Sequence, residues 1–189
     1  MGDGTNRYIA LLRGVNISGK NVVPMARLRI ELGKRGFNDV TTYLHSGNVL
    51  FSSTEETSGD GELAQRIEEA IVDAFNLRVP VLVMPLSNLV DVMNHAPAWW
   101  GGNDPAIYDN LIFVFPPASP ADVYREIGEP KAELEHIEPY RNTIFWSFSR
   151  KDYRKTNWWP KTASTPISKL LTIRTAKTIR KILSIDAHN

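Results

Sequence analysis

The clearest candidate for chemistry in this 189-residue chain is the glycine-rich stretch Gly14–Asn21. It fits the phosphate-binding pattern G-x-x-x-x-G-K-[S/T] except at the last position, where Asn21 replaces the hydroxyl residue that would hold Mg²⁺. The next helix is predicted to begin only at Pro24, so its N-terminus would not face the same loop. The pattern therefore favours a structural loop over a nucleotide-hydrolysing one. A third interpretation is an anion site that uses Arg13, Asn16, Lys20 and Asn21.

Histidines and carboxylates offer little further chemistry. The four histidines, at positions 45, 95, 136 and 188, lack the spacing of metal ligands, and the chain has no cysteine, so we expect neither a metal nor a cofactor. His45 is the one histidine to test as an acid–base group, in an enzyme that uses His45-Ser46-Gly47-Asn48, although such a residue is more often structural. Glu133, Glu135 and Glu138 are predicted to be solvated surface residues.

The net charge of +1 argues at first against a dedicated nucleic-acid-binding protein. It is, however, a cancellation between an acidic body, −7 over residues 1–149, and a basic segment, +9 over residues 150–181. Tyr153, Trp158 and Trp159 are interleaved with the basic residues, which is typical of surfaces that bind single-stranded nucleic acid. The alternative is that this segment packs on the acidic half with its tryptophans in the core.

The elements that position these residues follow from hydrophobic periodicity. Apolar runs predict strands at Tyr8–Leu12, Val40–Leu44, Val49–Ser53 and Pro80–Met84, and amphipathic stripes predict helices from Pro24 to Gly36 and over Glu62–Phe75. The order β-α-β-β-α-β is that of a ferredoxin-like, α+β subdomain over residues 1–85. Since its first and third strands should be antiparallel neighbours, Arg13, Asn16 and Lys20 are expected near Ser46 and Asn48.

Residues 86–189 are predicted to form a second, less regular α/β subdomain packed against the first, with basic C-terminal helices. A degraded copy of the first half is one interpretation. The predicted helices are Ser87–Met93, Ser119–Ile127, Thr165–Leu171 and a terminal helix that contains Ala176 and Ile182; the predicted strands are Asn110–Phe115, Leu134–Ile137 and Asn142–Phe148.

The sequence also predicts a cytoplasmic protein that does not enter a membrane. No apolar run approaches the ~20 residues that span a bilayer, and the N-terminus does not have the pattern of a signal peptide. No feature predicts an oligomeric state.

Two blocks resemble the signatures of a bacterial family called domain of unknown function 1697 (DUF1697). The first is Arg13–Asn21 followed by Pro24-Met25, and the second is Gly36-Phe37 with Thr42–Phe51. Lys169–Thr175 resembles a weaker C-terminal block, but Thr175-Ala176 stands where many members have Asn-Trp. The resemblance implies a soluble protein of ferredoxin-like units and no established activity, cofactor or substrate.

Together these observations favour binding of an anionic or phosphate-bearing ligand in a cleft between the two subdomains. The candidate ligand-binding residues are Arg13, Asn16, Lys20, Asn21, Ser46 and Asn48, joined by Lys169 and Arg174 from the second subdomain. The alternatives are nucleic-acid binding through the basic aromatic segment and an enzyme built on the His45 loop.

Overall fold

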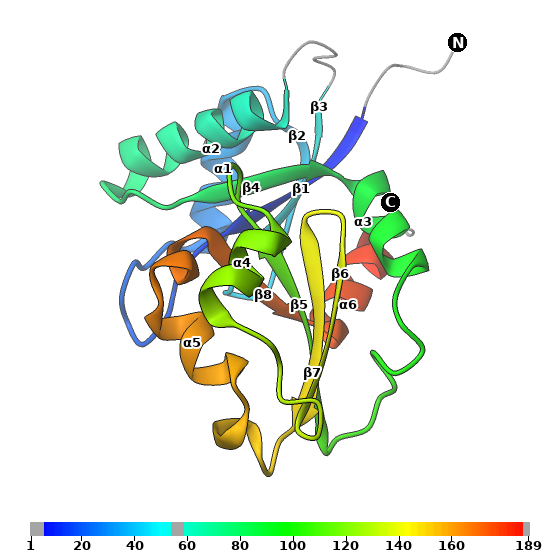
Figure 1. Cartoon of the computed structure of the whole chain (residues 1–189). Helices are drawn as coiled ribbons and strands as arrows, with labels where there is room; N and C mark the ends of the chain where they lie inside the picture. Colours follow the sequence, from blue (N-terminus) through cyan, green and yellow to red (C-terminus); the bar gives the residue numbers. More distant parts are fainter. Residues whose placement is uncertain (1–5, 54–58, 187–189) are drawn as a thin grey trace. The chain divides into compact units, whose positions relative to one another are not determined.

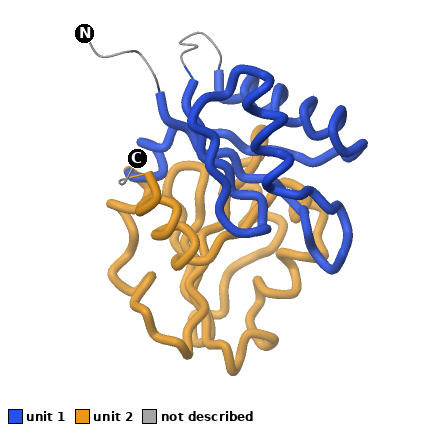
Figure 2. Tube along the Cα trace, turned by 180° about the vertical axis from the view of Figure 1, so that it is seen from behind, with its two compact units in different colours: residues 1–90, 189 blue, residues 91–188 orange. Residues whose placement is uncertain are grey.

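The structure, a computed structural model, describes residues 6–53 and 59–186. They divide into two compact units, and the boundary falls between Val90 and Asp91 (Figure 2). Within the described ranges, no helix combines the length and the apolar character needed to cross a membrane.

Unit 1 has the β-α-β-β-α-β element order of a ferredoxin-like fold. Its elements are β1 (Asn6–Leu12), α1 (Met25–Lys34), β2 (Asn38–Tyr43), β3 (Asn48–Ser53), α2 (Asp60–Phe75), β4 (Val81–Pro85) and the start of α3 (Leu86–Asn94). The strand order is β2-β3-β1-β4, and every neighbouring pair is antiparallel. Helices α1 and α2 cover the same face of this sheet (Figure 1). The α+β class is confirmed.

The core of unit 1 follows the predicted periodicities. Alternate residues of β1, namely Tyr8, Ala10 and Leu12, belong to the same buried cluster as the apolar stripes of α1 and α2. The stripes consist of Met25, Leu28 and Leu32 on α1 and of Leu63, Ile67, Ala70 and Ile71 on α2. The buried residues recur every second position along the strand and every third or fourth along the helices, and together they form one apolar layer.

Unit 2 has the same strand order. Its elements after α3 are β5 (Ile107–Val114), α4 (Pro120–Ile127), β6 (Glu135–Tyr140), β7 (Thr143–Ser149), the 3₁₀ turn η1 (Tyr153–Lys155), α5 (Trp158–Ser164), the 3₁₀ turn η2 (Pro166–Leu170), β8 (Leu171–Thr175) and α6 (Ala176–Asp186). The sheet runs β6-β7-β5-β8, which repeats β2-β3-β1-β4 position by position.

Matching hydrogen bonds extend this repeat to the end of the central strand. In unit 1 the last residue of β1 donates its N–H to the β2–β3 turn, Leu12 N to Gly47 O at 2.8 Å, and the next donates to the residue before β4, Arg13 N to Pro80 O at 2.9 Å. In unit 2 the corresponding bonds are Val114 N to Asn142 O at 3.0 Å and Phe115 N to Leu170 O at 2.8 Å. The repeat therefore identifies which connections of the two units correspond.

Two elements of unit 2 differ from the sequence prediction. The predicted helix Thr165–Leu171 is a short 3₁₀ turn that ends at Leu170, and the residues after it form β8, which pairs with β5. The β-branched residues Thr172 and Ile173 suit a strand, but their pairing partner is some 60 residues away in the sequence. Helix α5 was also not predicted from the sequence.

Glu135 corrects a further prediction, since this carboxylate is only 1% exposed instead of solvated. It accepts hydrogen bonds from Trp146 Nε1 at 3.1 Å, from Asn157 N at 2.7 Å and from Trp158 N at 3.3 Å. It thereby ties β6 and β7 to the start of α5, where the first N–H groups of the helix lack partners within the helix.

Replacing Glu135 should therefore destabilise unit 2. Glu135→Ala leaves these three N–H groups without an acceptor, so we expect the free energy of unfolding to fall by about 2–5 kcal/mol. Urea denaturation measures the change. The control is Glu133→Ala at an exposed position, with an expected change below about 0.5 kcal/mol. Equal effects of the two substitutions would contradict the anchoring role of Glu135.

Candidate functional site

Unit 1 carries two connections that are longer than their counterparts in unit 2. The segment between β1 and α1 spans residues 13–24, whereas the corresponding segment between β5 and α4 spans only 115–119. The β2–β3 turn spans residues 44–47, whereas the β6–β7 turn spans 141–142. We call residues 13–24 and 44–47 the signature loops. The fold closes with the shorter connections in unit 2, so the extra residues are not needed to build the sheet.

The first signature loop folds as a miniature hairpin. Asn16 N donates to Asn21 O at 3.1 Å, and Lys20 N donates to Ile17 O at 2.9 Å. At its tip, Ser18 and Gly19 both have positive φ, 49° and 75°, as a type I′ turn requires. The hairpin and the start of α1 at Met25 agree with the interpretation that this is not a nucleotide-hydrolysing loop. Glycine is placed here to turn the chain.

The carboxamide of Asn16 joins the two signature loops. Its Nδ2 donates to His45 O at 2.7 Å and to Val23 O at 3.0 Å, and its Oδ1 accepts from Val23 N at 2.9 Å. Asn16 itself has φ 55°, a left-handed conformation that asparagine tolerates better than most residues. The expected proximity of the loop after β1 to the turn before β3 is thus present in the structure.

Two other asparagines among the predicted site residues also bind backbone carbonyls. Asn21 Nδ2 donates to Gly14 O at 3.0 Å. Asn48 is buried, and its Nδ2 donates to Tyr43 O at 2.9 Å and to Ser46 Oγ at 3.0 Å. These side chains shape the loops, and their predicted contact with a ligand stays a prediction.

The cations of the signature loops have no acidic residue close to them in the sequence. Lys20 is exposed and Arg13 is half-buried. The sequence contains no Asp or Glu between positions 13 and 30 or between positions 40 and 53. Three large apolar side chains in the same loops, Ile17, Val22 and Leu44, are between 53% and 61% exposed. The loops therefore present positive charge beside apolar surface.

The predicted contacts in unit 2 have different environments. Lys169 is exposed on η2. Arg174 is buried on β8, where its Nη1 donates to Thr172 Oγ1 at 2.8 Å and to Ile173 O at 2.9 Å. Burial lowers the pKa of Arg174 to about 10, so its guanidinium keeps its charge at neutral pH. Their role as ligand contacts stays a prediction.

His45, the predicted acid–base candidate, is an exposed residue of the second signature loop. Its backbone carbonyl accepts the bond from Asn16, which fixes the turn and not the imidazole. A catalytic role for its imidazole therefore stays a prediction.

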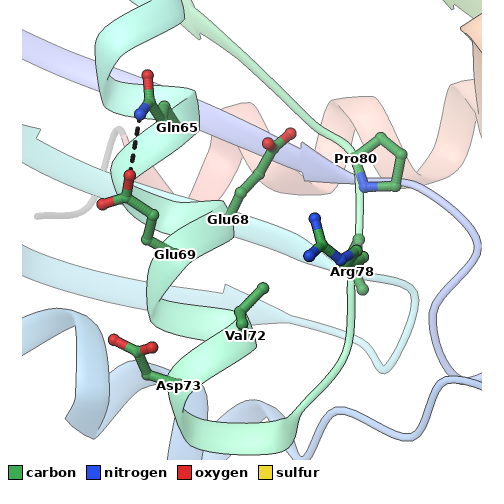
Figure 3. A pocket seen from close by; sticks show the side chains of 8 residues that line it. Gln65, Glu68, Glu69, Val72, Asp73, Arg78 and Pro80 are labelled. Carbon is green, nitrogen blue, oxygen red and sulfur yellow. Dashed lines mark hydrogen bonds between the residues drawn. The ribbon is translucent and has the colours of Figure 1, made fainter.

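A pocket of about 560 Å³ in unit 1 has none of the predicted ligand-binding residues in its lining (Figure 3). It lies between α2 and the segment Arg78–Pro80, and three of the side chains that line it are carboxylates. Each carboxylate has a partner: Glu68 Oε1 accepts from Val81 N at 2.8 Å, Glu69 Oε1 accepts from Gln65 Nε2 at 2.9 Å, and Asp73 pairs with Arg35 at 2.5 Å. Its acidic lining does not suit the anion that the sequence predicts.

The basic C-terminal segment divides into residues that hold unit 2 together and residues on its surface. Lys161 Nζ donates to Ile127 O at 2.7 Å at the end of α4, and Arg180 Nη1 donates to Asn103 Oδ1 at 2.9 Å. Trp158 is fully buried, whereas Trp159 is 40% exposed. Some residues of this segment therefore belong to the core of unit 2, and others lie on its surface.

Comparison with known proteins gives the family of the chain and a solved structure with a similar fold. A family model described as a protein of unknown function (DUF1697) matches residues 5–145. The chain belongs to the DUF1697 family. It is similar to a conserved bacterial protein, SP0830 from Streptococcus pneumoniae, with 28% sequence identity and a TM-score of 0.80, over 94% of this chain and 97% of that one. No curated protein matches it. Because these descriptions name no activity, the function of this DUF1697 chain has to be argued from its residues.

The close approach of Gly47 to the end of β1 makes it the most sensitive glycine of the signature loops. A Cβ at Gly47 would lie 2.6 Å from Leu12 Cβ and 2.8 Å from Val15 Cγ2, whereas a Cβ at Gly19 would meet nothing within 4 Å. Both glycines have φ 75°, so the backbone cost of alanine is the same at both.

We therefore expect Gly47→Ala to destabilise the DUF1697 protein by about 2–5 kcal/mol and Gly19→Ala by about 1–2 kcal/mol. Chemical denaturation of the two variants, compared with the unsubstituted protein, measures the difference. If Gly19→Ala costs as much as Gly47→Ala, steric exclusion by Leu12 and Val15 is not the cause.

Asn16 and Asn21 offer a second matched pair. Both have positive φ, but the Asn16 side chain makes three hydrogen bonds and the Asn21 side chain makes one. Asn16→Ala should thus lower the free energy of unfolding by about 1–2 kcal/mol more than Asn21→Ala. Amide hydrogen exchange at Val23 should also accelerate in Asn16→Ala, because the N–H of Val23 loses its acceptor. Unchanged exchange at Val23 would show that Asn16 does not hold the loop.

Proposed function

We propose that the DUF1697 chain binds a phosphate-bearing ligand at the signature loops of unit 1, with Lys20 as the principal charged contact and Arg13 as a second one. The observation that carries the proposal is the extra length of both loops relative to the repeat in unit 2. Residues that the fold does not require, and that are nevertheless held in one arrangement, are typical of binding loops on a rigid scaffold.

The rigidity of the first loop supports the proposal. The hairpin bonds and the three bonds of the Asn16 side chain fix the backbone around Lys20 before any ligand arrives. A preorganised loop loses little conformational freedom on binding, so more of the interaction energy contributes to affinity. The asparagines would act as the scaffold, and the ligand would contact the cations and the backbone N–H groups of the turn.

The charge of the loops favours an anion as ligand. Lys20 and Arg13 lie in sequence segments without Asp or Glu, so no carboxylate of the same loops competes with the ligand for them. Left-handed residues such as those at the turn orient successive backbone N–H groups toward one side, an arrangement that binds anions.

The exposed apolar side chains favour a ligand larger than inorganic phosphate. Ile17 and Val22 flank Lys20 in the sequence, and Leu44 lies in the second loop. A phosphate ester with an apolar or aromatic portion, such as a nucleotide, would cover part of this surface and gain from its burial. We accordingly expect AMP or ATP to bind more tightly than inorganic phosphate.

The proposal is tested by thermal shift and calorimetry with phosphate, pyrophosphate, AMP and ATP. We expect at least one of them to raise Tm by several degrees at saturation, and Lys20→Ala to weaken its binding at least about tenfold while the variant stays folded. Lys34→Ala is the matched control, because Lys34 is an exposed lysine of unit 1 that pairs with Glu31. The control should bind like the unsubstituted protein.

Chemical-shift mapping adds a position to the measurement. The amides of residues 17–21 should shift on addition of the ligand, and those of α2 should not. The proposal is overturned if none of the four compounds binds, or if Lys20→Ala and Lys34→Ala bind equally.

A further inference from the structure

We infer that unit 2 carries a separate binding surface for single-stranded nucleic acid, built from Tyr108, Tyr153 and Trp159 with Arg150 and Arg154. We call these five residues the aromatic–arginine platform. They come from β5, from η1, from the start of α5 and from the segment that follows β7. The platform shares no residue with the signature loops, so it goes beyond the function proposed above.

Trp159 is the centre of the platform. It is 40% exposed, whereas the preceding residue, Trp158, is fully buried. The Tyr108 ring is stacked with it at a centroid distance of 6.3 Å and an interplanar angle of 24°, and Tyr153 meets it edge to face at 4.8 Å. A partly exposed tryptophan is a side chain of the kind on which a nucleobase stacks.

Two arginines lie over the outer rings. The guanidinium carbon of Arg150 is 3.9 Å from the centroid of the Tyr108 ring, and that of Arg154 is 5.4 Å from the centroid of Tyr153. Arg150 Nε also donates to Ile107 O at 3.4 Å, and Arg154 Nε donates to Tyr153 Oη at 2.8 Å. These contacts use one edge of each guanidinium, and both residues are exposed. Positive charge is thus held beside the rings.

The segment that carries Arg150 and Arg154 has a positive net charge. Residues 150–155 contain four cations and one acid, Asp152. Asp152 pairs with Lys155 at 2.7 Å, and the hydrogen bond from Lys155 lowers the pKa of Asp152. Asp109, next to Tyr108, accepts a hydrogen bond from Ser147 Oγ. Asp152 and Asp109 therefore have partners inside unit 2, and residues 150–155 keep an excess of positive charge for phosphates.

The base of the platform is rigid. Trp159 packs against Phe148 at a centroid distance of 5.5 Å and against Trp146 at 6.4 Å, and both of these rings are buried. Trp146 and the start of α5 are held by the buried carboxylate of Glu135. An aromatic side chain that is already fixed loses little entropy when a base stacks on it.

These features favour a single strand over a duplex, because the faces of bases are covered in a duplex and exposed in a single strand. They also favour a strand over a mononucleotide, since the two arginines lie over different rings and successive phosphates of a strand could contact them separately. A duplex, a free mononucleotide or a protein partner is therefore an outcome that the test has to separate from the proposal.

The test measures binding of fluorescein-labelled 12-nucleotide dT and rU oligomers to the full chain by anisotropy at 25–200 mM salt. We expect affinity to fall with salt, with a slope of log K against log[salt] of about −1.5 to −3, as for two to four phosphate contacts on a single strand. Trp159→Ala should weaken binding about 5- to 150-fold. Arg150→Ala should weaken it and make the salt slope shallower by about 0.7.

Two further variants keep the result interpretable. Lys177→Ala removes an exposed cation from α6 of the same unit. Its affinity for the oligomer should stay within twofold of that of the unsubstituted protein. Trp159→Phe retains a ring and should keep most of the affinity, so a loss confined to Trp159→Ala is not caused by unfolding. In the unsubstituted protein, tryptophan fluorescence should be quenched by the oligomer, and this quenching should be largely lost in Trp159→Phe.

The proposal is overturned by any of three results: no binding of either oligomer at 25 mM salt, equal affinity for Trp159→Ala and the unsubstituted protein, or dTMP and duplex DNA competing as well as the oligomer. Trp159→Ala also separates this surface from the signature loops, because it should leave the binding of inorganic phosphate and pyrophosphate unchanged.

Discussion

The antiparallel pairing of β1 with β3 on one side and with β4 on the other is the constraint on which the rest of unit 1 depends. It brings the end of β1 to the turn before β3 and to the residue before β4, and the bonds from Leu12 and Arg13 close both approaches. The chain that leaves β1 must therefore run past the β2–β3 turn. Unit 2 forms the same sheet with short connections, so the longer connections of unit 1 are not required to form it.

The side chain of Asn16, and not additional backbone hydrogen bonds, connects the two signature loops. Asn16 uses both ends of its carboxamide, and no other residue type could donate twice and accept once from the same left-handed position with so short a side chain. This also explains why the stretch looks like a phosphate-binding loop in the sequence. Both the turn of a small hairpin and a phosphate-binding loop require glycines. The sequence pattern is therefore the same, although the backbone conformation differs.

The distribution of charge along the sequence likewise does not tell which cations lie on the surface. The sequence leaves open whether the basic segment packs inward or lies on the surface, and its residues divide between the two. Arg174, Lys161 and Arg180 bond to groups within unit 2, while Arg150 and Arg154 lie over exposed rings. Adjacent residues can take different roles, as at the start of α5, where Trp158 is buried and Trp159 is 40% exposed. A count of charges along the sequence cannot separate the two.

The sequence by itself determined the local structure of unit 1, the α+β class and the family, because strand and helix periodicities and two signature blocks are properties of neighbouring residues. The proximity of Asn16 to the His45 turn also followed from the expected strand order. Only the tertiary structure decided that residues 171–175 form β8, that Glu135 is buried, and that Trp159 and Tyr108 share a surface. Each of these depends on a partner that is far away along the chain, and periodicity carries no information about which distant segments meet.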